Sequence, residues 1–202
     1  MGKLIIIEGL DGCGKSTQTA LLQEYFEKNS INFKKIKLPD YDSKSSALVK
    51  MYLAGEFGKD ASDVNAYAAG AFYAVDRFAS YKLDWGKDYE NGTLILADRY
   101  ATSNSIYQME KIDESKWDEY LEWSADFEYN KIGIPKPDLV IFLDITVMRG
   151  KRTSMRLMLN FLIIAENQLY TRLVSRDGLL YLAQTVKIRF LSRKYIIPFL
   201  IL

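Results

Sequence analysis

Residues 9–16 read GLDGCGKS, and the types and spacing of these residues suit the binding of phosphate groups. The stretch follows the apolar run LIII at 4–7 and matches the pattern G-x-x-x-x-G-K-[ST]. Gly9, Gly12 and Gly14 allow the backbone to bend, so that successive N–H groups, including that of Cys13, can point at phosphate oxygens. The start of the helix that follows adds partial positive charge. The sequence therefore predicts a phosphate-binding loop between a strand and a helix.

The end of this loop carries the side chains that would meet a nucleotide. Lys15 is expected to reach the β- and γ-phosphates. The Ser16 hydroxyl is expected to ligate Mg²⁺, and Thr17 lies next to it. The alternative is an ordinary glycine turn that joins a strand to a helix, which the match and its context together disfavour.

Two carboxylates end predicted strands. Asp98 ends TLILAD, and Asp144 ends VIFLD. Transfer of a phosphoryl group also requires a carboxylate close to Mg²⁺, at the carboxyl end of a strand. Asp98 is the first candidate for this role and Asp144 the second. For each, the alternative is an ordinary cap at the end of a strand.

Arginine is rare in the first three quarters of the chain, although lysine is common there. Arg77 and Arg99 are the only arginines among residues 1–146. A planar guanidinium can grip a phosphate with two hydrogen bonds or read the edge of a base. Tyr73 precedes Arg77 by one helical turn and could stack on a nucleobase. The alternatives are surface salt bridges for the arginines and core packing for the tyrosine.

Hydrophobic patterning predicts the elements that position these residues. Apolar or alternating runs predict strands, and helical spacing with capping residues predicts helices, the longest opened by Ser62 or Asp63. Alternation of strands and helices predicts an α/β fold in one domain: a parallel sheet with helices on both faces, in three layers. The predicted strands are 3–9, 32–38, 93–99 and 137–145, and the predicted helices are 16–28, 47–58, 62–84 and 115–130.

The composition narrows the classes of function. The net charge of +1 gives no electrostatic reason to expect a nucleic acid or membrane partner. A single cysteine suits a reducing compartment, and no histidine is available as a base or ligand. No apolar stretch reaches the roughly 20 residues of a membrane span, and we expect no signal peptide, because a strand begins within four residues. A cytoplasmic protein is expected.

Three stretches together resemble the thymidylate kinase family of P-loop kinases. They are IIIEGLDGCGKST at 5–17, YAVDR at 73–77 and DRYATSNSIYQ at 98–108. The phosphate loop alone is widespread, whereas its E-G-x-[DE] opening, the D-R pair on a helix and D-R-Y-x-x-S are much more specific. The resemblance covers about residues 1–145. It implies a P-loop NTPase fold and Mg²⁺-assisted phosphorylation of dTMP by ATP in dTTP biosynthesis.

The resemblance also implies roles for single residues. Asp11 would bind the sugar hydroxyl or orient the acceptor, and Arg99 would grip the dTMP phosphate. Tyr73 stands where the family usually stacks a phenylalanine on thymine, and Arg77 would contact the base. Asp98 would act through Mg²⁺ and its waters, whereas Asp40 departs from the arginine that the family often has close by for gripping the phosphate. The remaining residues of the implied nucleoside pocket are Tyr41, Asn104, Tyr107 and Gln108. The resemblance further implies a homodimer through residues 62–84.

The sequence changes character after residue 146. Residues 147–202 hold 2 acidic and 10 basic residues, against 24 and 17 in residues 1–146. Gly12 replaces an arginine of some relatives, and such chains resemble a class whose lid supplies catalytic arginines. Arg152, with Arg149 and Lys151, would fill that role at the expected lid position.

The residues after this lid position do not continue the family pattern. We hypothesise a change of reading frame: shifted by one nucleotide, codons for TSMRLMLNFL can encode DIHEANVEFL, which resembles the family. The alternative is a divergent basic lid and C-terminal helix.

Two other functions stay open at this point. One is a related P-loop kinase that acts on a deoxynucleoside or another monophosphate. The other is a nucleotide-binding protein whose catalysis is impaired by the altered C-terminal segment. Transfer to thymidine but not to dTMP would favour the first, and ATP binding without turnover would favour the second.

Overall fold

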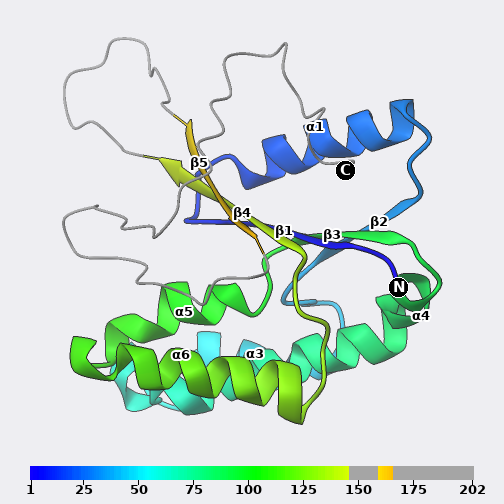
Figure 1. The fold of residues 1–202 in the computed structure, drawn as a ribbon. Coiled ribbons are helices and arrows are strands. Elements are labelled where there is room, and N and C mark those ends of the chain that lie inside the picture. The colour runs from blue at the N-terminus through cyan, green and yellow to red at the C-terminus, as the bar shows by residue number, and fades with distance from the viewer. Residues whose placement is uncertain (146–158, 166–202) are drawn as a thin grey trace.

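The computed structural model describes residues 1–145 and 159–165, with side chains through residue 143. Strands and helices alternate along most of this part of the chain (Figure 1). The strands are β1 Leu4–Gly9, β2 Phe33–Lys37, β3 Leu94–Asp98, β4 Leu139–Ile145 and β5 Leu159–Ala165. The α-helices are α1 Lys15–Lys28, α2 Ala47–Leu53, α3 Ala66–Ser80, α4 Gly86–Glu90, α5 Thr102–Gln108 and α6 Trp117–Ala125. Short 3₁₀ turns are η1 Lys44–Ser46, η2 Ala61–Asp63, η4 Met109–Lys111 and η5 Glu114–Lys116, and π-helical turns are η3 Tyr81–Trp85 and η6 Asp126–Lys131.

The sheet has the strand order β2-β3-β1-β4-β5. The first four of these strands run parallel, so their carboxyl ends meet at one edge. Ile7 of β1 is in register with Asp98 of β3, and Gly9 is in register with Leu143 of β4. The predicted α/β fold class is therefore confirmed, and the edge that carries the phosphate loop also carries the first candidate carboxylate.

Strand β5 differs from the sequence-based expectation of a purely parallel sheet. It pairs antiparallel with β4, with Leu139 opposite Ala165 and Ile145 opposite Leu159. Its sequence, LNFLIIA, is a short apolar run of the kind found in strands. No strand is predicted there from the sequence, because the segment is interpreted as the product of a shifted reading frame. An antiparallel neighbour, unlike a parallel one, does not require a long crossover helix.

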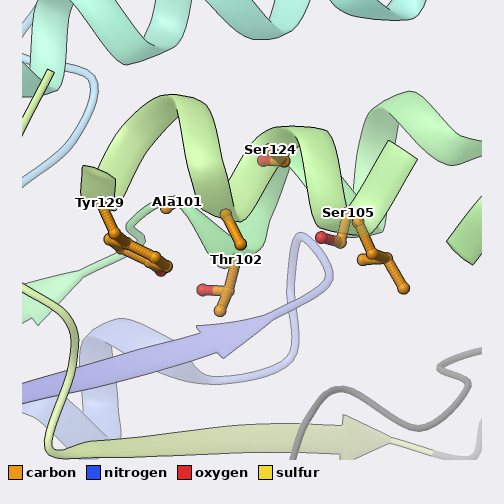
Figure 2. A pocket seen from close by; sticks show the side chains of 7 residues that line it. Ala101, Thr102, Ser105, Ser124 and Tyr129 are labelled. Atoms are coloured by element: carbon orange, nitrogen blue, oxygen red, sulfur yellow. The ribbon is translucent and has the colours of Figure 1, made fainter. Parts of the chain in front are cut away.

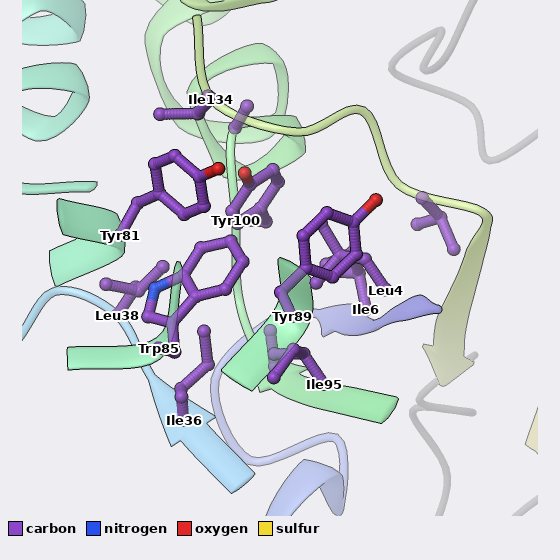
Figure 3. Packing of buried hydrophobic residues seen from close by; sticks show 13 residues of the cluster. Leu4, Ile6, Ile36, Leu38, Tyr81, Trp85, Tyr89, Ile95, Tyr100 and Ile134 are labelled. Carbon is purple, nitrogen blue, oxygen red and sulfur yellow. The ribbon is translucent and has the colours of Figure 1, made fainter. Parts of the chain in front are cut away.

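Helices cover both faces of the sheet (Figure 1). The continuous apolar run of β1 is explained by burial on both sides: Leu4 and Ile6 join one hydrophobic cluster, and Ile5 and Ile7 join the other. The first cluster is rich in aromatic rings from η3 and α4, with Trp85 fully buried (Figure 3). The second lies beneath α1. Among the described residues, no helix is long and apolar enough to cross a membrane.

The long helix predicted at 62–84 begins later than expected. Asn65, rather than Ser62 or Asp63, is the N-cap of α3, and its side chain accepts a hydrogen bond of 2.8 Å from the Ala68 N–H. Asp63 instead forms a capping box with Asp60 on η2. The extended backbone of Val64 separates the two elements. At its other end α3 continues into the π-helical turn η3, which directs Tyr81 and Trp85 into the core.

Strand β2 forms an edge of the described sheet and carries Lys34, Lys35 and Lys37 among its five residues. Lys34 forms 2.8 Å salt bridges with Asp84 and Asp88. Hydrogen bonds to these two carboxylates, from η3 and α4, raise the pKa of Lys34. The other two lysines are exposed. Strand β2 thus contributes Ile36 to the core and presents positive charge along its outer side.

Candidate active site

The phosphate loop joins β1 to α1 with the backbone that its glycines predict. Gly12 and Gly14 have φ values of 78° and 88°, which L-residues rarely adopt. Gly9 is constrained by space as well, since a Cβ there would lie 2.6 Å from Cys13 Sγ and 2.7 Å from the Leu143 carbonyl oxygen. Helix α1 begins at Lys15 with no acidic residue in its first turn. Its N-terminus therefore offers backbone N–H groups and partial positive charge to an anion.

Lys15 is positioned over this loop. Its side chain is buried, and its ammonium donates to the carbonyl oxygens of Gly9 at 2.7 Å and Leu10 at 2.9 Å. The same Nζ lies 4.0 Å from Asp11 Oδ1. Ser16 and Thr17 are exposed beside it at the start of α1. Ammonium, hydroxyls and backbone N–H groups thus lie together at one end of the helix, as the sequence predicts for a phosphate site.

Asp98 lies at the neighbouring strand end with an unsatisfied oxygen. It is 8% exposed, and among the described residues its Oδ1 has no hydrogen-bond partner. A buried carboxylate oxygen without a partner is unfavourable unless a cation or donor satisfies it. No group of three or more acidic or cysteine side chains clusters in the described part of the chain. Asp98 and Ser16 therefore fit a Mg²⁺ that takes its other ligands from phosphates and water. The side chain of Asp144, the second candidate, lies outside the described residues.

Arg99 projects from the residue that follows Asp98. Its φ of 71° is unusual for a residue with a side chain, and such a conformation costs about 1–3 kcal/mol. Its Nη2 donates to Asp11 Oδ1 at 2.5 Å, and the guanidinium lies 4.9 Å from the centre of the Tyr107 ring. Asp11 is an exposed residue of the phosphate loop, and Tyr107 belongs to helix α5. Arg99 therefore bridges these two elements. The structure thus brings together Asp11, Lys15, Arg99 and Tyr107, four of the predicted site residues.

Glu8 fixes the turn from which Arg99 projects. This side chain is fully buried at the end of β1, and its carboxylate accepts hydrogen bonds from Tyr100 N at 3.1 Å, Thr102 Oγ1 at 2.7 Å and Ser103 Oγ at 2.8 Å. Burial raises the pKa of Glu8, and the hydrogen bonds from Thr102, Ser103 and Tyr100 oppose that rise. Sequence reasoning placed Glu8 in a motif but gave it no role.

Replacement of Glu8 by leucine is expected to lower the free energy of unfolding by about 3 kcal/mol, because it leaves buried donors without an acceptor. Urea denaturation measures this change. The matched control is Glu24→Leu, since Glu24 is exposed on α1. Equal stability of the two variants would show that the buried carboxylate does not hold the turn.

Arg77 is buried rather than exposed. Its Nε donates to Glu128 Oε2 at 2.6 Å and its Nη2 to Glu128 Oε1 at 2.5 Å. Asn104 Nδ2 donates to the same Oε1 at 3.0 Å and to the Gly70 carbonyl oxygen at 3.2 Å. The alternative of a surface salt bridge for Arg77 is therefore wrong. Glu128 escaped sequence reasoning, because its partner is 51 residues away and its element, η6, is a π-helical turn.

Tyr73 lies near both arginines, and Tyr41 lies near Arg99. The pKa of the Tyr73 hydroxyl is raised to about 12, mainly by burial; the nearby Tyr41 and Tyr52 also raise it, and Arg77 and Arg99 oppose the rise. The Tyr73 ring meets Tyr52 edge-on at 6.4 Å between centres. Tyr41 is 45% exposed and is influenced by the charges of Arg99 and Asp11. Tyr73 is therefore close to Arg77 and Arg99, and Tyr41 is close to Arg99 and Asp11, the charged residues predicted to share their site.

Asp76, a further residue without a predicted role, ties α3 to the loop around residue 40. Its Oδ2 accepts from the Asp40 N–H at 3.1 Å, and its Oδ1 accepts from Ser45 Oγ at 2.6 Å. The side chain is fully buried. Asp40 thus contributes its backbone N–H to the packing of this loop. Tyr41 is held next to α3 by this connection.

Helix α5 carries a buried polar atom without a partner in the described part of the chain, Gln108 Oε1. The Tyr107 hydroxyl on the same helix lies beside the Arg99 guanidinium. Gln108 is buried and lies one helical turn after Asn104, on the same face. Buried polar atoms usually have partners, so unsatisfied ones are typical of a surface that receives a ligand.

A separate small pocket lies between α5 and α6 (Figure 2). Alanine and hydroxyl side chains line most of it, and Thr102, at its floor, donates to Glu8. The pocket contains none of the predicted site residues. Its lining residues are Ala101, Thr102, Ser105, Leu121, Ser124, Ala125 and Tyr129. Arg152, with Arg149 and Lys151, lies outside the described residues.

A phosphate loop at the carboxyl edge of a parallel sheet, faced by an arginine on the next strand end, defines a P-loop nucleotide kinase. The family model for thymidylate kinase matches residues 7–187. The chain therefore belongs to the thymidylate kinase family.

Individual relatives agree with this assignment. A probable thymidylate kinase of Thermococcus gammatolerans is 32% identical over 155 residues, which are 75% of this chain and 70% of that protein. A thymidylate kinase of Mycobacterium tuberculosis is 30% identical over 157 residues, 76% of this chain and 71% of that protein. The solved thymidylate kinase structure from Candida albicans has a TM-score of 0.55 and 27% identity, and the match covers 74% of this chain and 68% of that one. These pairwise matches extend over about three quarters of the chain, in agreement with the resemblance expected over residues 1–145.

Proposed function

We propose that the protein transfers the γ-phosphoryl group of ATP to dTMP and releases ADP and dTDP. The observation that carries this proposal is the position of Arg99, which is bound to Asp11 of the phosphate loop and stacked on Tyr107 of α5. The Arg99 guanidinium in this position can bind the phosphate of the acceptor next to the ATP at the phosphate loop. Membership of the thymidylate kinase family supports dTMP as that acceptor.

The proposed mechanism depends on positioning and charge. An oxygen of the dTMP phosphate attacks the γ-phosphorus of ATP, and the bond between this phosphorus and the β–γ bridging oxygen breaks. The Lys15 ammonium and the N–H groups of the loop stabilise the charge on the transferred group and on the leaving ADP. Arg99 holds the attacking phosphate in line. No general base is required, because the attacking oxygen is already anionic.

Other groups complete the proposed site. Mg²⁺, held by Ser16 and Asp98, would neutralise charge on the ATP phosphates. Asp11 orients both Arg99 and the acceptor sugar, and the Tyr73 ring stacks on the base. Residues that contact the nucleoside in this proposal are Tyr41, Arg77, Asn104, Tyr107 and Gln108. Arg152 supplies a further catalytic cation from the lid.

The test is an assay of purified protein with Mg-ATP and one of dTMP, dUMP or thymidine. Chromatographic separation of the products should show dTDP and ADP in equal amounts. Transfer to thymidine alone would contradict the proposal, because it would place a hydroxyl rather than a phosphate at Arg99. Binding of ATP without formation of any diphosphate product from dTMP would contradict it as well.

We also propose that residues 147–202 form an altered lid and C-terminal segment of the same domain, with the reading frame shifted after GKR at 150–152. Support comes from the pairwise matches, which cover 71–77% of the chain in eight of the similar relatives, whereas the family model extends to residue 187. Sequencing the gene across the codons for residues 146–153 tests the proposal. A variant with the frame restored should show a higher kcat with dTMP than the present chain. Equal kcat values would indicate a divergent but functional segment.

A homodimer through α3 and η3 is the proposed assembly, in the cytoplasm, where ATP is available and Cys13 stays reduced. Apolar side chains are exposed along these elements: Val75 at 47%, Phe78 at 36% and Leu83 at 82%. Replacement of Phe78 by glutamate should shift the protein from dimer to monomer, because it places a charge within an apolar contact. Light scattering after gel filtration measures the mass. Leu53→Glu, on exposed α2, is the control, and a dimer that persists in Phe78→Glu would contradict this surface.

A further inference from the structure

Glu128 lies at the centre of a buried polar network that the proposed chemistry does not explain. Glu128 is 1% exposed, and Arg77 and Asn104 are each 3% exposed. Both partners donate to the same carboxylate oxygen, Oε1, and come from different helices, α3 and α5. A structural ion pair would require only Arg77. The additional bond to Asn104 connects the carboxylate to the two side chains proposed to contact the base.

The network leaves hydrogen-bonding groups unused on each partner. Glu128 accepts from Nε and from one N–H of Nη2 of Arg77, so the second N–H of Nη2 and both N–H groups of Nη1 are not used by this ion pair. Asn104 faces Glu128 and the Gly70 carbonyl oxygen, both of which are acceptors only. The amide nitrogen must point at both acceptors, and both of its N–H groups are used. The Asn104 carbonyl oxygen is therefore turned away from them.

Arg77 thus contributes a donor and Asn104 an acceptor, and both side chains are bound to the same Glu128 oxygen. The pairing edge of thymine or uracil presents an acceptor, O4, next to a donor, N3–H. Cytosine presents the reverse order, the N4 amino donor next to the N3 acceptor. A mismatched polar group in a buried site lowers affinity strongly, because it leaves protein groups unpaired.

We propose that Glu128 is a specificity-determining positioning residue, which sets the polarity of the base site by orienting Arg77 and Asn104 and so selects thymine and uracil over cytosine. This inference rests on the proposed function for the location of the base. It assigns to Glu128 an effect on which base is bound, beyond its contribution to stability. Without the carboxylate, Arg77 loses its charged partner, and the Asn104 amide keeps only the 3.2 Å bond to the Gly70 carbonyl oxygen, so its orientation is less firmly fixed.

The test measures dissociation constants for dTMP, dUMP and dCMP by titration calorimetry without ATP, so that turnover is not required. The unmodified protein is expected to bind dUMP about tenfold or more tightly than dCMP. In Glu128→Gln this ratio is expected to fall to about threefold or less, since a neutral amide can pair with Asn104 in either orientation. The matched control is Glu122→Gln, an exposed position on α6, which should retain the full ratio. Glu128→Asp, which keeps the charge, should restore part of it.

The outcomes separate the possible roles. A purely structural role for Glu128 would weaken all three nucleotides by the same factor and would overturn the inference. If Glu128→Gln does not fold, the unmodified protein still decides, because equal affinity for dUMP and dCMP overturns the inference. A chain that discriminates between these nucleotides but does not phosphorylate dTMP would support the inference and contradict the proposed function. A chain that phosphorylates dTMP and dCMP equally would do the opposite.

Discussion

Replacement of Lys15 by methionine is expected to lower kcat by about a thousandfold or more, on the scale measured when a cation at a transferring phosphoryl group is removed. Methionine keeps most of the length of the side chain but carries no charge. The Lys15 ammonium already lies at the loop, where it donates hydrogen bonds to the carbonyl oxygens of Gly9 and Leu10. Steady-state assays at saturating Mg-ATP and dTMP measure the change.

The control for this variant is Lys28→Met, at the exposed end of the same helix. It should retain kcat within about twofold, because surface substitutions away from the site have small effects. A Lys15→Met protein that keeps its thermal midpoint and loses activity would assign the loss to chemistry. An active Lys15→Met protein would contradict the proposed phosphate site.

Replacement of Arg99 by lysine is expected to lower kcat/KM for dTMP by about a hundredfold, on the basis of a charge-assisted pair of hydrogen bonds that lysine cannot form. Lysine retains the charge but lacks the planar fork that binds Asp11 and stacks on Tyr107. Most of the effect should be in KM for dTMP, whereas KM for ATP should change little. Initial rates with each substrate varied in turn measure both constants.

A second variant, Asp11→Asn, separates two explanations of an Arg99→Lys effect. It removes the ion pair but leaves the guanidinium in place. If Arg99 acts by gripping the acceptor phosphate, KM for dTMP should rise less in Asp11→Asn than in Arg99→Lys. An equal rise in both variants would indicate that the ion pair, rather than contact with the phosphate, is responsible.

The sequence alone could predict the parts of the site that depend on local chemistry. The phosphate loop is a continuous stretch, and its glycines adopt the positive φ values that only glycine tolerates well. Asp98 could be found because it ends an apolar strand. Arg77 and Arg99 stood out in a lysine-rich stretch, and the structure shows that each guanidinium binds a carboxylate.

The carboxylates that position these residues were not predictable in the same way. Glu8 binds residues 92 to 95 positions later, and Glu128 binds Arg77 from 51 positions away. Such pairs depend on the register of the sheet and on the packing of helices, which local periodicity does not specify. The start of α3 was misplaced for a related reason, since Ser62, Asp63 and Asn65 are all good capping residues. The extended backbone at Val64 decided between them.

The lysines of β2 have a consequence for how copies of this chain can meet. An edge strand has unpaired backbone N–H and C=O groups, which can pair with a strand of another molecule. Uncharged edge strands of this kind promote polymerisation. Here a second β2 would bring Lys35 and Lys37 against their own counterparts, so like charges repel any attempt to extend the sheet by that route. Extension of the sheet by a second copy at this edge is therefore disfavoured.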